Sequence, residues 1–176
     1  MNEYEFERMG RVLALCVRAR WVAHALFDSS AQLLDFGASR FRSTRSAQAR
    51  FLFLVDVLDP TIVVFRKMSE ENGRDRPKAK KLVHFMRRAC HRLSLYVVLL
   101  SREHVRNFFR VRGARSKHEI ASALAEQFPV LAWKLPPRRR NYDHEHWNAP
   151  IFDAVALGLS YFPRSTEEST AQLIHE

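Results

Sequence analysis

The sequence predicts an α/β fold whose mixed sheet combines a three-strand meander with parallel strands and carries helices on both faces. Two observations predict this class. Three β-prone runs follow one another near the N-terminus, and strand-sized apolar runs then alternate with helical segments. We expect residues 1–10 to form an N-terminal extension, residues 11–162 one domain, and residues 163–176 a C-terminal tail.

The meander is expected at the start of the domain. Residues 11–15 are almost wholly apolar, which is typical of a central strand that is buried on both faces. A second β-prone run covers residues 21–27, and a third covers residues 31–36. The turn formers between them, Asp28, Ser29 and Ser30, predict a hairpin.

A helix followed by a buried strand is predicted next. The helix is expected over residues 43–58, where Ser43 or Thr44 can accept hydrogen bonds from its first turn and Pro60 ends it. Residues 61–65 are mainly β-branched and apolar, so they predict a buried strand.

The second half of the domain is predicted to be mainly helical. A basic amphipathic helix begins near Pro77, and residues 95–100 predict another buried strand. Ser101 and Ser116 are expected to cap two short helices, and Asn148 is expected to cap the last helix. The stretch before that last helix is rich in proline and charge and is predicted to be irregular.

The composition is that of a basic globular protein. The 176 residues carry a formal net charge of +10, with a sequence pI near 10.3, 47% hydrophobic residues and a mean hydropathy of −0.30. Basic residues recur along the whole chain, which favours a folded surface that binds nucleic acid. No apolar run approaches 18 residues, so we expect no membrane span. Cys16 and Cys90 are expected to be free thiols in a reducing cytoplasm.

Four stretches of this sequence, taken in order, resemble the RuvC-like Holliday-junction endonucleases of the RNase H-like superfamily. They cover most of residues 11–162. The stretches are "RVLALCVRARWVAHALFD" with the following "LLDFG", "DPTIVVFRK", "VVLLSREHVRNFFRVRGARSKHEIASALAEQFP" and "IFDAVALGLSYF". The resemblance implies an RNase H-like sheet and, for active members, phosphodiester hydrolysis by two Mg²⁺ ions.

The resemblance also indicates where the metal-binding carboxylates should be. The aspartate of the first strand falls at Cys16, the glutamate of the fourth strand falls at Arg66, and the aspartate of the closing helix is retained as Asp153. Mg²⁺ requires oxygen ligands, which a thiol and a guanidinium do not supply. A shift of one residue restores neither acid. The sequence therefore predicts a nuclease fold without the nuclease chemistry and without a metal cofactor.

Asp153 lies in an apolar helix and needs a partner if it is buried. We expect Arg66 to form an ion pair with it in place of the metal ions. The alternative is an acid in the first turn that interacts favourably with the helix dipole.

Basic residues of three segments are predicted to contact phosphates. They follow the first strand, surround the turn after residues 102–109, and precede the last helix. These residues are Arg18, Arg20, Arg106, Arg110, Arg112, Arg115, Lys117, Arg138, Arg139 and Arg140. Phe108, Phe109 and Trp133 could stack on bases, with packing in the core as the alternative for each.

Three functions remain open from the sequence. The first is an inactive protein that binds DNA or another nucleic acid through its basic surface. The second is an active Mg²⁺-dependent endonuclease that uses Asp153 with Glu145 or Asp143. The third is a structural subunit that docks onto a protein partner in a nucleoprotein assembly, and the apolar face of the basic helix could also serve a homodimer.

Overall fold

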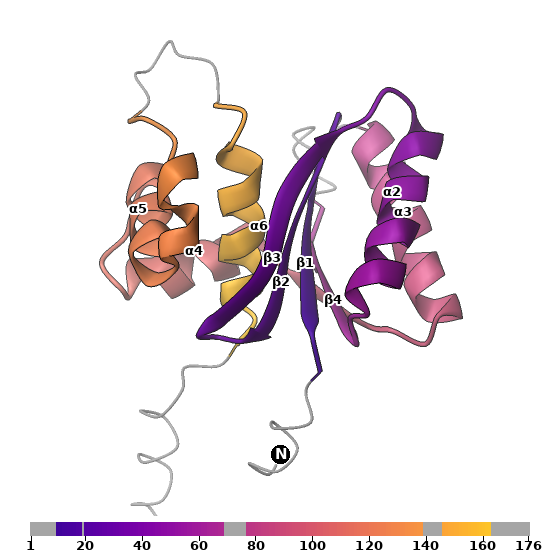
Figure 1. Cartoon of the computed structure of the whole chain (residues 1–176), viewed down its shortest axis with the longest axis horizontal. Coiled ribbons are helices and arrows are strands. Elements are labelled where there is room, and N and C mark those ends of the chain that lie inside the picture. Colours follow the sequence, from indigo (N-terminus) through magenta and orange to yellow (C-terminus); the bar gives the residue numbers. More distant parts are fainter. Residues whose placement is uncertain (1–9, 19, 69–76, 139–145, 163–176) are drawn as a thin grey trace, which may run out of the picture.

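The computed structural model describes residues 10–18, 20–68, 77–138 and 146–162. Five strands form one sheet between two helical layers, with α2 and α3 on one face and α4, α5 and α6 on the other (Figure 1). The elements are β1 (Val12–Val17), β2 (Trp21–Ser29), β3 (Gln32–Arg40), α2 (Thr44–Leu58), β4 (Ile62–Arg66), α3 (Pro77–Arg92), β5 (Tyr96–Leu100), α4 (Arg102–Arg110), α5 (Lys117–Gln127), the 3₁₀ helix η1 (Pro129–Lys134) and α6 (Ala149–Leu159). The predicted mixed sheet with helices on both faces is confirmed.

The strand order is β3-β2-β1-β4-β5. The pairs β1–β2 and β2–β3 are antiparallel and form the predicted meander, whereas β1–β4 and β4–β5 are parallel. The predicted hairpin turn was too long, because β2 continues through Asp28 and Ser29 and only Ser30 and Ala31 form the turn. Shifts in register near the end of β2 accommodate this extension.

The central strand β1 separates two hydrophobic cores. Its side chains alternate, so that Val12, Ala14 and Cys16 pack on the α6 side, while Leu13, Leu15 and Val17 pack on the side of α2 and α3. All six residues are buried, as the apolar run predicted. Cys16 and Cys90 are free thiols that belong to different cores, with the sheet between them.

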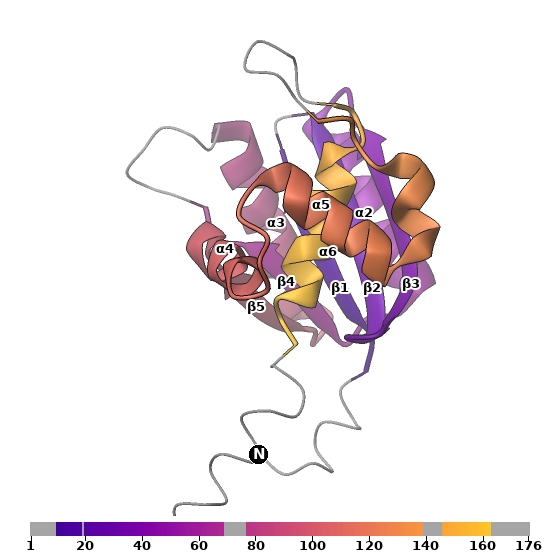
Figure 2. The same ribbon diagram turned by 90° about the vertical axis from the view of Figure 1, so that its left-hand side faces the viewer.

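Helix α6 lies unusually close to the sheet. A Cβ atom built on Gly158 would lie only 2.4 Å from Phe27 Cε2 and 3.0 Å from Ala14 Cβ. The Phe27 ring also makes edge contacts with Phe128 and Phe162, with ring centroids 5.9 and 5.8 Å apart. Glycine at this point therefore allows the close approach of α6, which lies over β1 and β2 (Figure 2).

The predicted caps are confirmed for three helices and wrong for the last. The hydroxyls of Ser43, Ser101 and Ser116 accept hydrogen bonds from backbone N–H groups in the first turns of α2, α4 and α5. Asn148 makes no such bond. Its side-chain Nδ2 instead donates to Lys134 O at 3.0 Å, which ties α6 to η1, a helix that the sequence did not predict.

The predicted burial of β5 is also wrong. Tyr96 and Leu99 expose 67% and 38% of their surface. The cause is the strand order, because β5 is the last strand of the sheet and pairs with β4 alone among the described strands. Within the described residues, no helix is long and apolar enough to span a membrane.

Candidate nucleic-acid interface

The carboxyl ends of β1 and β4 bring Cys16 and Arg66 side by side. The two strands are parallel, and their last matched pair is Leu15 with Phe65. Cys16 and Arg66 each follow that pair by one residue. Alternation along the strands places both on the face covered by α6, where Ala14 and Val64 also pack. The positions that the resemblance assigned to two metal-binding acids are therefore adjacent in space.

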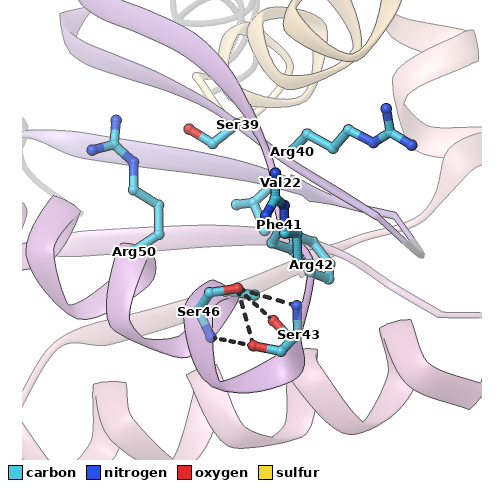
Figure 3. A pocket seen from close by; sticks show the side chains of 9 residues that line it. Val22, Ser39, Arg40, Phe41, Arg42, Ser43, Ser46 and Arg50 are labelled. Atoms are coloured by element: carbon cyan, nitrogen blue, oxygen red, sulfur yellow. Dashed lines mark hydrogen bonds between the residues drawn. The ribbon is translucent and has the colours of Figure 1, made fainter.

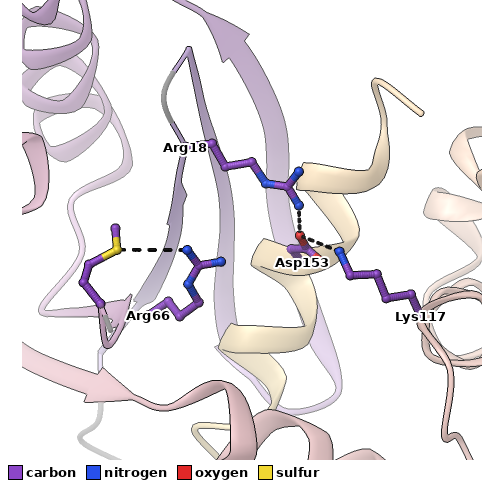
Figure 4. Close-up of polar contacts among 5 residues, drawn as sticks. Arg18, Arg66, Lys117 and Asp153 are labelled. Carbon is purple, nitrogen blue, oxygen red and sulfur yellow. Dashed lines mark hydrogen bonds and ion pairs between the residues drawn. The ribbon is translucent and has the colours of Figure 1, made fainter. Parts of the chain in front are cut away.

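Asp153 approaches this point from α6 and is held by two cations (Figure 4). Its Oδ2 accepts a hydrogen bond from Arg18 Nη2, which makes a close ion pair. Lys117 Nζ lies 3.8 Å from the same oxygen. The Asp153 side chain remains 28% exposed, so this group of charges is open to solvent. We call Cys16, Arg18, Arg66, Lys117 and Asp153 the Asp153 cluster.

The partner predicted for Asp153 was wrong. Figure 4 shows ion pairs from Asp153 to Arg18 and Lys117, but not to Arg66. Arg18 directly follows β1, and its N–H donates to Trp21 O at 2.8 Å, which fixes the turn beside α6. Arg66 Nη2 lies 4.0 Å from Met68 Sδ. The guanidinium paired with Asp153 thus belongs to Arg18, in the turn after β1. Matching only the strand ends to the family did not indicate this residue.

The α5 start that carries Lys117 is fixed by a capping box. Ser116 Oγ accepts from Glu119 N at 3.2 Å, and Glu119 Oε2 accepts from Arg115 N at 2.7 Å and Ser116 N at 2.9 Å. These backbone donors lower the pKa of Glu119, so it stays ionised. The rigid first turn directs Lys117 toward α6.

Cys16 adds no negative charge to the cluster. Burial raises the pKa of its thiol, and the Asp153 carboxylate acts in the same direction, while Arg18 and Arg66 oppose them. A thiol with a raised pKa is neutral at physiological pH. The cluster therefore contains one carboxylate, one neutral thiol and three cationic side chains.

These residues do not fit a pair of Mg²⁺ ions. Magnesium prefers several oxygen ligands, and the only carboxylate of the cluster is already paired with Arg18 and Lys117. Within the described ranges, no three His, Cys, Asp or Glu side chains are placed to hold a metal ion. Asp143 and Glu145, the alternative ligands named from the sequence, lie outside the described residues.

The predicted phosphate contacts fall into separate groups. Arg18 and Lys117 meet at the Asp153 cluster. Arg106 and Arg110 are exposed on α4, which contacts the C-terminal end of α6 through His104 Nε2 and Ser160 O, 2.8 Å apart. The structure does not bring those two arginines into the cluster. The other predicted residues with described positions are also exposed, namely Arg20, Arg112, Arg115 and Arg138. Arg139 and Arg140 lie outside the described residues.

The three aromatic candidates have different environments. Phe109 is 2% exposed and belongs to the core, so packing is its role. The ring of Phe108 is covered by the guanidinium of Arg112, with Cζ 3.6 Å from the ring centroid. Trp133, in contrast, is 73% exposed.

A basic hollow beside the start of α2 was missed by the sequence analysis. Its volume is about 390 Å³, and Arg40, Arg42 and Arg50 line it together with Ser43 and other residues (Figure 3). Arg40 and Arg50 extend to opposite sides in Figure 3, so the hollow is an open surface rather than an enclosed anion pocket. The signal was present in "RFRSTRSAQAR", a basic run that was interpreted only as the entry to a helix.

The hollow lies next to the turn that carries Arg18 and Arg20. Phe41 N–H donates to Arg20 O at 3.0 Å, and Trp21 pairs with Arg40 across the β2–β3 ladder. Guanidinium groups therefore follow the same end of the sheet from β1 to the start of α2. This distribution widens the basic surface beyond the residues predicted from the sequence.

Comparison with known proteins identifies the fold but no sequence family. The chain matches no protein-family model, and no curated protein matches it in sequence.

Solved structures of Holliday junction resolvases are similar to this chain. Thermus thermophilus RuvC has a TM-score of 0.63 and 13% identity, covering 85% of this chain and 92% of that chain. The fowlpox virus Holliday junction resolvase has a TM-score of 0.54 and 18% identity, covering 86% and 96%. The yeast mitochondrial Holliday junction resolvase has a TM-score of 0.60 and 8% identity, covering 87% and 79%. The chain therefore has the RuvC-like form of the RNase H fold.

Proposed function

We propose that this protein binds nucleic acid, with DNA as its natural ligand, and does not cleave it. The observation that carries the proposal is the Asp153 cluster, in which a guanidinium and a neutral thiol occupy the strand ends and the one carboxylate is already paired with cations. The net charge of +10 supports a polyanionic partner. Two of the similar structures are complexes of RuvC and of fowlpox resolvase with Holliday junction DNA.

The cluster is suited to bind a phosphate group. In the Asp153 cluster as defined from the described residues, three cations stand beside one acid, and the Lys117 side chain is 72% exposed. Guanidinium and ammonium groups bind phosphate oxygens directly, and each contact releases counterions from the nucleic acid. The arginines around the hollow at the start of α2 lie on the other face of the sheet and add a second basic surface to the one at the cluster.

Hydrolysis is disfavoured at this site by its charge. Two-metal catalysis requires several carboxylates that neutralise the ions and hold them on both sides of the scissile phosphate. Arg66 places a permanent positive charge where a metal ion would need a negative ligand. Binding should therefore be independent of divalent cations.

The test is a panel of Holliday junction, duplex, RNA–DNA hybrid and single-stranded ligands, measured with Mg²⁺, Mn²⁺ or EDTA. We expect salt-sensitive binding that persists in EDTA and therefore requires no divalent cation, and we expect intact strands afterwards. Arg18→Gln and Lys117→Gln should each reduce the slope of log affinity against log salt by roughly one unit or less. Lys81→Gln, at an exposed residue of α3 on the opposite face of the sheet, is the matched control.

Two outcomes would contradict the proposal. Metal-dependent cleavage that Asp153→Asn abolishes would identify an active endonuclease with additional acidic ligands. Absence of binding to all four ligands, together with a cellular complex that survives nuclease treatment, would identify a structural subunit.

A further inference from the structure

Two tryptophans are exposed close together on the α6 side of the sheet. Trp133, in η1, is 73% exposed, and Trp147, just before α6, is 57% exposed. The chain has three tryptophans, and the remaining one, Trp21, is half-buried at the start of β2. Large apolar rings that are left in water contribute little to folding, so two of them together indicate a contact surface. We call Trp133 and Trp147 the tryptophan pair.

A lysine lies between the two rings. Lys134 Nζ is 3.9 Å from the ring centroid of Trp133 and 5.4 Å from that of Trp147. Both distances are within the range of cation–π attraction. The ammonium group thus holds a positive charge beside two indole faces, a combination that suits a ligand with both flat rings and negative charges.

The two indoles are held by the fold. Asn148 follows Trp147 and is 4% exposed, and its Nδ2 donates to Lys134 O at 3.0 Å. Leu131, two residues before Trp133, is fully buried in the core. Both tryptophans are therefore carried by anchored backbone, so little conformational entropy is lost when a ligand stacks on them.

The tryptophan pair and the Asp153 cluster both lie near the N-terminal end of α6. Trp147 lies two residues before the start of α6 and Asp153 lies in its second turn, so the backbone rises on the order of 9 Å between them. This separation is close to the span of two or three nucleotides in a stacked strand, which rises about 3.4 Å per nucleotide. A strand whose phosphate binds at the cluster can therefore place neighbouring bases near the pair.

We propose that the tryptophan pair is a stacking site for unpaired bases, with Lys134 contacting the adjacent phosphate. The inference rests on the proposed nucleic-acid binding and adds that the protein distinguishes unpaired from paired bases. In a duplex, the base faces are covered by their neighbours and cannot stack on an indole. In single strands and at the opened centre of a junction, the base faces are accessible. The charge of Lys134 disfavours a purely apolar partner.

The test measures affinity and stacking separately. A labelled single-stranded 20-mer and the matching blunt duplex are titrated with the full-length protein, using fluorescence anisotropy for affinity and tryptophan emission for stacking. The single strand should quench the emission, and the duplex should quench it far less. Trp133→Ala and Trp147→Ala should each weaken single-strand binding by about five- to a hundredfold and leave duplex binding nearly unchanged.

The control variants distinguish base stacking from nucleic-acid binding in general. Trp133→Phe should retain much of the affinity, because a phenyl ring still stacks. Val130→Ala, at an exposed apolar residue of η1, should change neither ligand's affinity. Equal affinity of the wild type and the Trp133→Ala/Trp147→Ala variant for the single strand, with duplex binding intact, would overturn the stacking site alone and leave the pair as a protein-docking surface. Loss of binding by the wild type to every ligand would instead overturn the proposed function.

Discussion

The two faces of the sheet each hold an aspartate with a basic partner, but the two pairs are built differently. On the α6 side, Asp153 is paired with Arg18, and both side chains are about one quarter exposed. On the side of α2 and α3, His24 Nε2 lies 2.9 Å from Asp35 Oδ2, and the imidazole is only 4% exposed. The first pair has a permanently charged base that faces solvent. The second has a titratable base that is buried.

The environment of each pair indicates its role. Lys117 and Arg66 add positive charge around Asp153, so that pair belongs to an open, cationic surface. Burial lowers the pKa of His24, although the hydrogen bond and charge of Asp35 oppose the shift. A Cβ on Gly37 would come within 2.9 Å of His24 Cε1, so the ring fills the space that this glycine leaves. The Asp153 pair is suited to binding, and the His24 pair is suited to packing.

The largest effect is expected from restoring acids to the Asp153 side. Cys16→Asp/Arg66→Glu would bury at least one new carboxylate beside Asp153 and lower the free energy of unfolding by about 3 kcal/mol in EDTA. Millimolar Mg²⁺ should recover part of this loss, because three carboxylates would then surround one position. Urea unfolding with and without Mg²⁺ measures both effects.

The control for that variant is Cys16→Ser/Arg66→Gln, which should show no response to Mg²⁺. If the acidic variant were equally indifferent to Mg²⁺, its carboxylates would not converge as the strand register indicates.

A smaller loss is expected from Gly158→Ala, which tests how closely α6 approaches the sheet. The new methyl group would overlap the Phe27 ring, so we expect destabilisation of about 2 kcal/mol, despite the better helix propensity of alanine. Thermal or urea unfolding gives the value. Phe27→Leu in the same chain should relieve part of the overlap, and strictly additive effects of the two changes would argue against this contact.

The His24 pair should make stability depend on pH in a defined direction. The pKa of His24 is lowered in the folded protein from its ordinary value of 6.5. As the pH falls below about 6.5, the unfolded chain takes up a proton that the folded protein resists, so the free energy of unfolding should decrease. Urea unfolding from pH 8 to pH 5 tests this, with His24→Gln as the reference. A wild type that follows the same pH curve as the variant would show that His24 titrates normally.

The smallest effect is expected for Asp153→Asn, which separates the two pairs by function. Removing the acid takes away one negative charge beside Arg18 and Lys117, so affinity for DNA should rise about threefold, a change of under 1 kcal/mol. The matched change on the other face, Asp35→Asn, should alter stability and leave DNA affinity unchanged. Fluorescence anisotropy at two salt concentrations measures the DNA affinity of both variants. A lower affinity for Asp153→Asn would contradict this interpretation.

Local patterns in the sequence predicted most of the fold. The wholly apolar run at β1, the caps at Ser43, Ser101 and Ser116, and the helix that begins at Pro77 depend on neighbouring residues, and all are confirmed. The burial of β5 depends on which strand ends the sheet, and the local sequence does not encode that order. η1 is a single short 3₁₀ helix, which leaves no amphipathic period to detect.

The sequence indicated two residues that lie together in the candidate site, but not the contacts of Asp153. Cys16 and Arg66 stand at the ends of two adjacent parallel strands, and their assignment to the metal-ligand positions stays a prediction. The pairing of Asp153 with Arg18 and Lys117 joins residues 135 and 36 positions apart in sequence, as the differences 153 − 18 and 153 − 117 give. Such contacts depend on how α5 and α6 pack on the sheet, which no local pattern specifies.

The position of α6 has a consequence for how the protein is made. Its residues are synthesised after all five strands, yet they cover the buried apolar side of β1 and β2 and supply Asp153. A ribosome-bound chain that stops before residue 149 would have its sheet but would leave that side open to water. We therefore expect truncated products to aggregate or be degraded, so that the Asp153 cluster is completed only on chains that were translated through the last helix.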